Sequence, residues 1–378
     1  DGKGKAIIGL LNYFASQHVN SIYFLTMNIG GDGKNVWPFA GDIDPEGNPN
    51  NDNLHYDISK LRQWEIVFKH AQSKGIFLHF VYNEAERKNK LELDEAELGI
   101  ERKLYYREII GRFGHHNALQ WNICEEYDLA FDLGPERVKE FARYIDAVDP
   151  YDHPITVHHK GRNADPAWLP FLGFPHFSTT SFQFYDNTAQ WGTHVEKWRR
   201  LTEVAGRPLP INMDEFKMLN TDNEEQVRKE VLWPTYLSGG HVEYILDRGF
   251  RENNFKRTEN TWRWTRYARR FMVENLPFWE MEPNDPILQG ETTDMGGGQV
   301  FVKNGSVYAI YLPVGQPSGR LMVSSKNGPW EKRWFNPRTG SFEGKSETLK
   351  ELSHPELGDP PSAPQEDWVI LFKRADRQ

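Results

Sequence analysis

Apolar, strand-like runs alternate with amphipathic stretches from residue 5 to about residue 275. The run Ile22–Met27 is unbroken in its apolar character, which predicts a buried strand. After a loop rich in Gly, Asp and Asn, apolar residues recur at helical spacing from about Ile58 to Lys74. Gly75 follows directly, at a position where a left-handed helix cap is favoured. The pattern therefore predicts a strand, a loop and a helix as one unit.

The same unit repeats along the chain. Further strands are expected at residues 76–82, 118–123, 155–158, 177–182, 209–213 and 242–246. Helices are expected between and after them, at residues 98–113, 135–147, 165–172, 190–205, 224–237 and 257–275. Parallel neighbours need a helical crossover, so this rhythm predicts an α/β fold with a parallel sheet. Eight such units close a TIM (β/α)8 barrel. The rival is a doubly wound open sheet, which usually carries a glycine-rich phosphate turn that is not evident in this sequence.

The chain opens with helix-like residues 6–16, directly before what would be the second strand of a barrel. The first strand is therefore expected upstream of residue 1, in an upstream segment or in another polypeptide. The start Asp1–Lys5 lacks methionine, so the chain is interpreted as a processed or trimmed product.

The pattern changes after Pro283. Short apolar runs at 300–302, 307–312 and 368–372 are separated by Asn-Gly, Pro-Ser-Gly and Thr-Gly turn signals. We therefore predict a (β/α)-barrel domain in residues 1–284 and a small antiparallel β-sandwich in residues 285–378.

Composition excludes several classes of protein. A formal charge of −9 argues against nucleic-acid binding, which needs a basic surface. No apolar run approaches the roughly 20 residues of a membrane span. The single cysteine, Cys124, excludes an internal disulfide framework. The 13 Trp, 15 Tyr and 23 Phe suit a sugar-binding cleft, although a large aromatic core accounts for most of them.

Two carboxylates stand where a barrel places its chemistry, at the carboxyl ends of strands. Glu126 follows the expected fourth strand, and Glu215 ends the expected seventh strand across the barrel mouth. Glycosidic bond cleavage uses such a pair, one carboxyl group as acid and the other as nucleophile or base. The neighbouring Glu125 is able to raise the pKa of Glu126 by charge repulsion, whereas Asp214 is expected to point away from Glu215. The alternative is that these carboxylates cap helices or pair with arginines.

Several other strand-end residues are candidates for substrate binding. Asn28, Asn83 and Glu84 either bind sugar hydroxyls or satisfy backbone groups at loop entries. Glu243 is the rival nucleophile, with a buried carboxylate paired to an arginine or tyrosine as the alternative. Of the adjacent His158 and His159, one is expected to line the cleft and the other to pack, because neighbours on a strand point to opposite faces.

The remaining candidates lie in or near loops of the same face. Gln183 and Tyr185 are expected to hydrogen-bond the nucleophile or the substrate, and Asp247 to close the cleft or pair with Arg248. Trp37 and Trp191 are candidate stacking platforms or structural residues. The loop that starts at Asp42 has only a partial calcium-loop pattern. We expect neither a metal site nor a cofactor.

The stretches Tyr23–Asp32, Ser59–Glu65 and Gly114–Asn122 resemble bacterial glycoside-hydrolase-like proteins of the DUF5060 group. The stretches Tyr311–Pro313 and Trp334–Gly340 are similar to a β-sandwich domain labelled collagen-binding. The resemblance implies a barrel like those of clan A glycosidases, with a first strand and an N-terminal β domain upstream of residue 1. It also implies a secreted, periplasmic or cell-surface protein. It also implies an acid/base glutamate after strand four and a nucleophile ending strand seven.

Carried over to this chain, the resemblance assigns the acid/base to Glu126 and the nucleophile to Glu215. Glu125 stands where clan A commonly has an asparagine that contacts the sugar 2-hydroxyl, which leaves the choice between Glu125 and Glu126 open. The function predicted is retaining hydrolysis of a β-linked oligo- or polysaccharide. The alternative is a non-catalytic carbohydrate- or matrix-binding protein on a barrel scaffold.

Overall fold

The computed structural model of the chain describes residues 6–31, 33–44, 46–161, 164–184, 190–216, 222–245, 255–291 and 296–375. The chain divides into two compact units. The first consists of Asp1–Asp186, Leu201–Met218 and Glu243–Asn254, and the second of Asn187–Arg200, Leu219–Val242 and Phe255–Gln378. The second unit therefore contains helices that the sequence pattern grouped with the barrel. The domain boundary expected between residues 284 and 285 stays a prediction.

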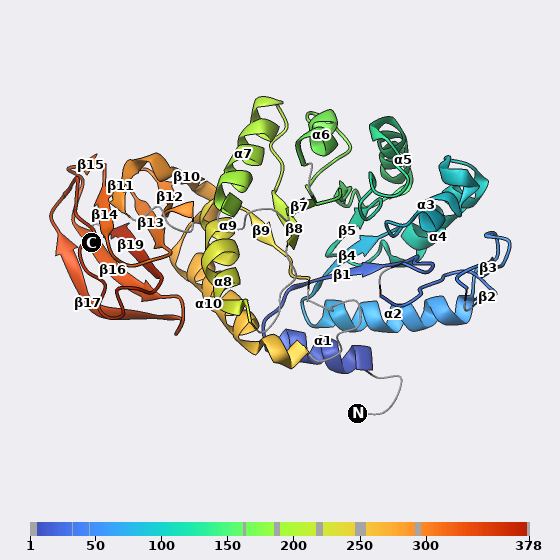
Figure 1. Cartoon of the computed structure of the whole chain (residues 1–378), viewed down its shortest axis with the longest axis horizontal. Coiled ribbons are helices and arrows are strands. Elements are labelled where there is room, and N and C mark those ends of the chain that lie inside the picture. The colour runs from blue at the N-terminus through green and yellow to red at the C-terminus, as the bar shows by residue number, and fades with distance from the viewer. Residues whose placement is uncertain are drawn as a thin grey trace. The chain divides into compact units, whose positions relative to one another are not determined.

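Parallel strands form the centre of the first unit. β1 (Ser21–Leu25), β4 (Phe77–Val81), β5 (Leu119–Asn122) and β6 (Ile155–Thr156) form a four-stranded parallel sheet in this order (Figure 1). β7 (Phe182–Phe184) pairs in parallel with β8 (Asn212–Phe216). The predicted parallel α/β fold is thus confirmed. Within the described residues, the strands belong to separate sheets and not to one closed barrel.

The environment of β1 differs from the prediction. All five of its residues are half-buried, whereas β4 is buried at four of its five positions. β1 is the edge strand of its sheet in the described structure, so one side of it lacks the cover that an inner strand receives. The fully buried strand predicted at Ile22–Met27 is therefore wrong in its degree of burial.

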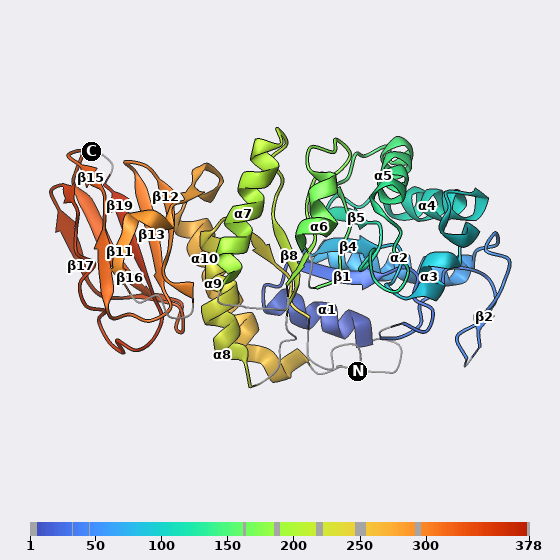
Figure 2. The ribbon, with the colours of Figure 1, turned by 45° about the horizontal axis from the view of Figure 1, so that its top comes forward.

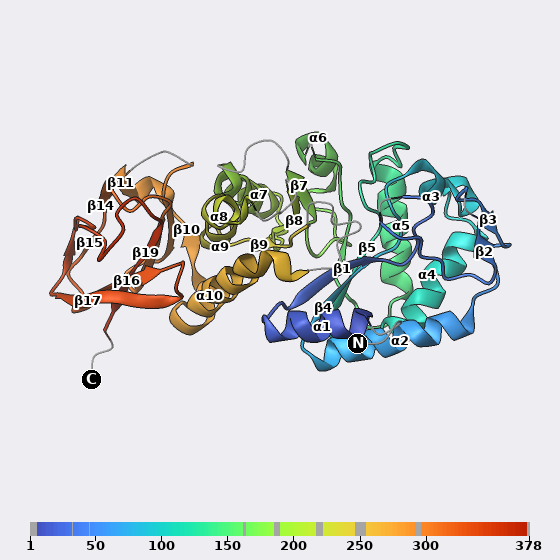
Figure 3. The ribbon, with the colours of Figure 1, turned by 60° about the horizontal axis from the view of Figure 1, so that its bottom comes forward.

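An outer layer of helices covers the parallel strands. α1 (Ala6–Ser16), α2 (Ile58–Ser73), α4 (Ile100–Phe113) and α5 (Pro135–Val148) pack in succession, each against the next (Figure 3). The side chain of Asp57 caps α2 by accepting a hydrogen bond from the backbone N–H of Lys60 at 3.0 Å. Gly75 follows this helix with φ of +73°, as the predicted cap requires.

Shorter elements connect these strands and helices: β2 (Asp42–Ile43), β3 (Pro49–Asn50), α3 (Arg87–Leu91), η1 (Asp94–Ala96), α6 (Ala164–Trp168) and η2 (Leu169–Phe171). β7 and β8 start later than expected. Pro208 and Pro210 have no N–H to donate to a ladder, so regular pairing of β8 begins only at Asn212.

Helices and a second sheet make up the other unit. α7 (Trp191–Val204) precedes β8, and α8 (Glu224–Gln226), the π-helix η4 (Val227–Leu232) and α9 (Trp233–Leu237) follow one another without a break. The helix predicted at 224–237 is thus confirmed, with a π-helical middle. The remaining elements before the sheet are β9 (His241–Val242), η6 (Phe255–Thr258), α10 (Glu259–Asn275) and η7 (Phe278–Glu280).

The C-terminal sheet is antiparallel and has six strands (Figure 2). Their order is β10 (Glu282–Pro283), β12 (Gln299–Lys303), β13 (Val307–Leu312), β19 (Trp368–Arg374), β16 (Trp330–Asn336) and β17 (Ser341–Leu349). The 3-10 helix η8 (Asp285–Ile287) precedes two further strand pairs. These are β11 (Leu288–Glu291) with β14 (Ser318–Leu321), and β15 (Ser324–Ser325) with β18 (Leu352–Ser353). The predicted antiparallel β domain is confirmed, while the sequence pattern missed β14, β16 and β17.

Alternation along the strands places the two faces of this sheet in different cores. Tyr311 and Phe335 pack with Trp233 and Phe271, so α9 and α10 cover one face. The intervening Ile310 and its neighbours pack with residues of the small strand pairs on the other face. A bidentate pair joins these layers within the second unit. The Arg228 guanidinium donates to both oxygens of the buried Asp367 at 3.0 Å each.

None of the helices in the described part of the chain combines the length and apolar character that a membrane span needs.

Candidate active site

Two carboxylates and a histidine meet at the strand ends of the first unit. Glu125 follows β5, His158 follows β6, and Glu215 lies near the end of β8. One carboxylate oxygen or ring nitrogen from each residue lies within 4.8 Å of the others. His158 Nε2 is 3.8 Å from Glu215 Oε2, and both side chains are buried, whereas Glu125 is half-buried. Residues 90 positions apart thus share one small polar site.

Glu125 and Glu126 have different electrostatic neighbours. The charges that act on Tyr23 come from Glu125, Asp214 and Glu215, whereas Glu126 acts on Lys90. The Lys90 ammonium also donates to the Glu126 backbone carbonyl at 2.7 Å. Glu126 has a left-handed backbone with φ of +40°, which turns the chain directly after Glu125. Of the two glutamates, Glu125 is therefore the one that belongs to the Glu215 site.

Asn122 connects the two strand ends that carry Glu125 and His158. Its side-chain oxygen accepts hydrogen bonds from the backbone N–H of Cys124 at 3.3 Å and of His158 at 3.2 Å. Asn122 is itself buried at the end of β5. The Asn122 amide thus fixes the backbone at Cys124, next to Glu125, relative to the backbone of His158.

A second polar cluster involves the same strands. His79 Nδ1 lies 2.8 Å from Glu243 Oε2, and Asn122 donates to His79 Nε2 at 3.1 Å. The acceptor role of Nε2 assigns the proton to Nδ1, which donates to Glu243. Glu243 also accepts a hydrogen bond from Ser21. Glu243 is therefore a paired carboxylate, although its partners are a histidine and a serine and not the arginine or tyrosine considered from the sequence.

Asp214 belongs to this second cluster, with His79 and Glu243, and accepts a hydrogen bond from Ser181. Burial, followed by the charges of Glu243 and Glu215, raises the pKa of Asp214 well above its ordinary value. The shift favours the protonated form of Asp214. Its side chain contacts other partners than its neighbour Glu215.

Tyr23 supplies a hydroxyl group to the site. Burial and the charges of Glu125, Asp214 and Glu215 raise its pKa well above the ordinary value, so the hydroxyl stays neutral. Its oxygen is buried and has no hydrogen-bond partner among the described residues. The ring contacts His79 edge-on, with centroids 4.6 Å apart. The Tyr23 hydroxyl is therefore a donor available to a carboxylate or to a ligand.

The two adjacent histidines have separate roles. His159 Nδ1 donates to the Lys160 carbonyl at 2.7 Å, and its Nε2 accepts from the backbone N–H of Gln183 at 3.3 Å. Both ring nitrogens of His159 are thus hydrogen-bonded within the protein at the strand ends. Neither ring nitrogen of His158 has a hydrogen-bond partner in the described structure. Burial lowers the pKa of His158 well below its ordinary value, so a neutral imidazole faces Glu215.

The buried His159 predicts loss of stability in acid. Burial lowers its pKa to about 4, from about 6.5 in an unfolded chain. Between these pH values the unfolded state binds a proton that the folded state does not, so the free energy of unfolding falls as pH falls. The loss amounts to about 3 kcal/mol near pH 4. Urea unfolding of the first unit at several pH values measures it. His159→Gln is expected to flatten this pH dependence, and an unchanged slope would contradict the assignment.

Three polar residues expected in the cleft make hydrogen bonds within the protein. Asn28 accepts from the Gly31 N–H at 2.9 Å, and Asn83 donates to the Asn89 carbonyl at 3.1 Å. Glu84 accepts from the Glu86 N–H at 3.0 Å. These bonds fit the alternative considered from the sequence, in which such residues satisfy backbone groups at loop entries. Substrate binding by them stays a prediction.

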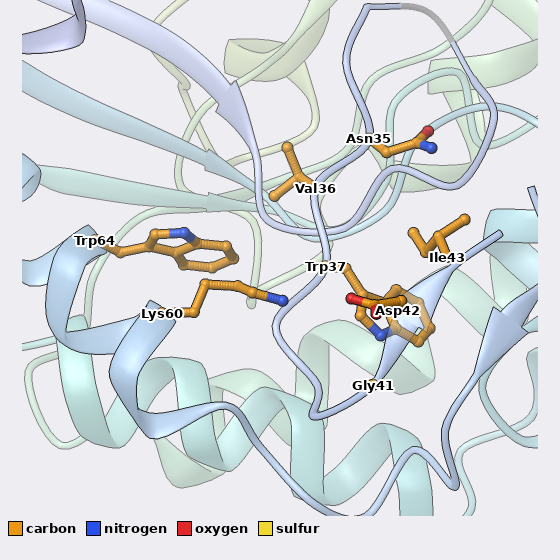
Figure 4. Close-up of a pocket in the computed structure, with 8 residues that line it drawn as sticks. All are labelled: Asn35, Val36, Trp37, Gly41, Asp42, Ile43, Lys60 and Trp64. Carbon is orange, nitrogen blue, oxygen red and sulfur yellow. The ribbon is translucent and has the colours of Figure 1, made fainter. Parts of the chain in front are cut away.

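Neither expected tryptophan platform presents an open ring. Trp37 is 5% exposed and Trp191 is fully buried, because packing of their large apolar area outweighs display to solvent. Trp37 instead lines a pocket of about 320 Å³. Lys60 and Trp64 of α2 line one side of this pocket, and the segment 35–43 lines the other (Figure 4). None of its lining residues belongs to the carboxylate site.

Gln183 is fully buried and lies opposite Glu215 in the β7–β8 register. This position agrees with the expected role beside the nucleophile, which stays a prediction. Tyr185, Asp247 and Arg248 lie outside the described residues.

The sequence pattern missed Tyr23, His79, Asn122 and Ser181 as site residues. Each is a polar group inside or beside an apolar strand. A histidine or asparagine in such a run is the signal that was available, because a buried polar side chain needs a partner.

Among the residues that the structure describes, three groups of side chains bring together atoms that metal ions bind: Glu125 with His158 and Glu215, His79 with Asp214 and Glu243, and Glu65 with His115 and His116. The expected absence of a metal and of a cofactor stays a prediction.

No family model and no curated protein matches this sequence. Solved structures do match it. A glycoside hydrolase family 5 protein from Bacteroides vulgatus is similar with a TM-score of 0.71 at 15% identity, over 97% of this chain and 86% of that chain. A second glycoside hydrolase gives 0.71 at 14% identity, over 98% and 89%. An endo-1,4-β-D-mannanase from Thermotoga petrophila gives 0.50 at 15% identity, over 72% and 96%.

These likenesses establish a fold like that of family 5 glycoside hydrolases. At such low identity they establish the fold alone. The resemblance to the DUF5060 group and to a collagen-binding domain is not confirmed by them.

Proposed function

We propose that this protein is a retaining glycoside hydrolase that cleaves a β-linked glycan, with Glu215 as nucleophile and Glu125 as acid/base. The observation that carries the proposal is the approach of these two carboxyl groups to within 4.8 Å. Retaining enzymes hold their carboxyl groups about 5–5.5 Å apart, whereas inverting enzymes need about 6.5–9.5 Å to admit a water molecule. The glycosidase-like fold supports the same chemistry.

The surroundings of the pair support this division of roles. Two carboxyl groups this close favour a state with one proton between them, which provides one acid and one nucleophile. The raised pKa of Asp214 disfavours a further negative charge beside Glu215, and the lowered pKa of His158 favours a neutral imidazole there. The Tyr23 hydroxyl is available to stabilise the carboxylate that remains ionised.

In the first step of the proposed reaction, Glu125 donates its proton to the departing glycosidic oxygen while Glu215 attacks the anomeric carbon. The bond from that carbon to the leaving oxygen breaks as the bond to the Glu215 carboxylate forms. In the second step, Glu125 removes a proton from water, which attacks the same carbon and releases Glu215. Two inversions leave the configuration of the sugar unchanged.

Assignment of the acid/base to Glu125 departs from the residue that the family resemblance implied. The charge of Glu126 acts on Lys90, and the left-handed backbone of Glu126 turns the chain directly after Glu125. A contact between Glu125 and the sugar 2-hydroxyl, with Glu126 as proton donor, is the competing assignment. Comparison of the Glu125→Gln and Glu126→Gln variants distinguishes these two assignments.

Activity on β-linked polysaccharides tests the function. The full chain is incubated with β-1,4-mannan, β-1,4-glucan, β-1,4-xylan and β-1,3-glucan, and proton NMR follows the first anomer released. We expect hydrolysis of at least one polymer with the β-anomer appearing first. An α-anomer appearing first would mean inversion. Tight binding of a glycan without any turnover would favour the non-catalytic carbohydrate binder.

We also propose that the protein acts outside the cytoplasm, because polymeric glycans occur there. It also includes membership of the DUF5060 group. The C-terminal sheet is proposed to brace or extend the enzyme, and collagen binding by it is the alternative that the resemblance implies.

A further inference from the structure

Two histidines approach one carboxylate at the amino-terminal end of β5, the end opposite to Glu125. His115 and His116 lie on the loop between α4 and β5, and Glu65 lies on α2. His115 Nε2 is 3.2 Å from Glu65 Oε1, and His116 Nε2 is 3.1 Å from Glu65 Oε2. All three donor atoms lie within 4.8 Å of one another. The two imidazoles lie against each other, with ring centroids 4.3 Å apart.

The hydrogen bonds around Gln72 determine which nitrogen of His116 carries a proton. The Asn117 backbone N–H donates to Gln72 Oε1 at 2.9 Å, so this atom is an oxygen. The same oxygen lies 3.3 Å from His116 Nδ1, which must therefore be the N–H donor. In the neutral ring, the lone pair of Nε2 then points at the Glu65 carboxylate.

A lone pair aimed at a carboxylate is unfavourable unless a cation lies between them. One remedy is a proton on Nε2, which gives an ion pair between His116 and Glu65. A bound metal ion is the other remedy. It uses the Nε2 lone pair and the carboxylate together, and the Nδ1–H···O bond to Gln72 is the outer contact that orients metal-binding histidines.

We propose that Glu65, His115 and His116 bind a divalent transition metal ion, with Zn²⁺ as the best fit. Two imidazole nitrogens and one carboxylate oxygen form a common set of three protein ligands for zinc, which completes its tetrahedron with water. The His115 side chain is 45% exposed and that of Glu65 is 23% exposed, so the fourth position is open to solvent.

Lys69 competes with the metal for the same carboxylate. Its ammonium lies 3.2 Å from Glu65 Oε1, one helical turn along α2. The Lys69 side chain is 66% exposed, and an exposed pair of this kind contributes little to stability. A metal ion displaces it into solvent at small cost. Replacement of Lys69 by Gln is therefore expected to tighten metal binding.

The site joins α2 to the loop that leads into β5, whose far end carries Glu125. A metal ion here stabilises the folded first unit by a free energy that grows with the logarithm of its affinity, because it binds the folded chain and not the unfolded one. The carboxylate pair and the metal site share no residue, so the two proposals fail independently.

Isothermal titration of the metal-free full chain with Zn²⁺ tests the site, and the visible absorption of bound Co²⁺ reports its geometry. We expect one ion per chain and the strong absorption of a tetrahedral centre. His115→Ala should weaken binding by at least about 100-fold, because one of three ligands is lost. Gln72→Ala should weaken it about 10- to 100-fold through the orientation of His116.

His55→Ala and Glu215→Gln serve as controls, because the first removes an exposed histidine elsewhere and the second removes a carboxylate of another donor group. Neither should change the affinity for Zn²⁺. Circular dichroism confirms that each variant is folded. Failure to bind Zn²⁺ would overturn the proposal. Binding that survives His115→Ala but is lost in Glu215→Gln would overturn it too, by moving the ion to the other cluster.

Discussion

Replacing Glu215 by Gln is expected to lower kcat by about 10⁴-fold or more on whichever β-glycan the protein cleaves. A carboxamide has almost the same shape as the carboxylate but does not attack the anomeric carbon, so the covalent intermediate fails to form. Initial rates measured at saturating substrate give the loss. An unchanged urea midpoint shows that the effect is on chemistry and not on folding.

Glu243→Gln is the matched control, because Glu243 is the rival carboxylate and is held by His79 and Ser21. Its replacement should affect stability more than turnover. Added azide gives a second readout. In the smaller Glu215→Ala variant, azide attacks from the side of the missing nucleophile and forms the α-glycosyl azide. Activity of Glu215→Gln within tenfold of the parent protein would remove Glu215 as nucleophile.

Glu125→Gln is expected to lower turnover of natural glycans by about 10²- to 10⁴-fold, the contribution of a positioned general acid. Glu126→Gln should stay within about tenfold of the parent protein, because the donor group found among the described residues joins Glu125, and not Glu126, to His158 and Glu215. An aryl glycoside with a good leaving group needs little protonation. The first step of Glu125→Gln should therefore recover on that substrate.

Azide separates the two glutamates further. In Glu125→Ala, azide replaces water in the second step and forms a β-glycosyl azide, because it attacks the covalent intermediate on Glu215. The parent protein and Glu126→Ala should form none. The reverse ranking, with Glu126 sensitive and Glu125 tolerant, would return the acid/base to the residue that the family resemblance implied.

Local pattern was a reliable guide to regular elements. The helices predicted at 58–74 and 135–147 agree with α2 and α5 to within one residue, and the strand predicted at 307–312 coincides with β13. These elements bury one face or both faces against a core, so their apolar residues recur with the period of the element. The prolines before β8 were also informative, because they cannot donate a backbone hydrogen bond. Regular pairing therefore starts at Asn212, later than the apolar run suggested.

Position along the chain also predicted that acidic residues near 125 and 215 meet at one site, and the structure brings Glu125 and Glu215 together. It did not decide between Glu125 and Glu126, because both follow the same strand and have the same composition. The decision depends on the left-handed turn at Glu126 and on the side chains that surround each residue. Such loop geometry comes from contacts with residues far away in sequence, which no local period records.

The sequence by itself determined the alternation of strands and helices in the parallel half, the change to an antiparallel half, and the region of the carboxylates, since each depends on side-chain periodicity or on residue type. Only the tertiary structure decided which side chains meet. It joined Glu125 to His158 and Glu215, buried the rings of Trp37 and Trp191, and brought His115 and His116 onto Glu65. The physical reason is that contacts between distant residues depend on the complete packing of strands and helices, and each element alone is compatible with many of them.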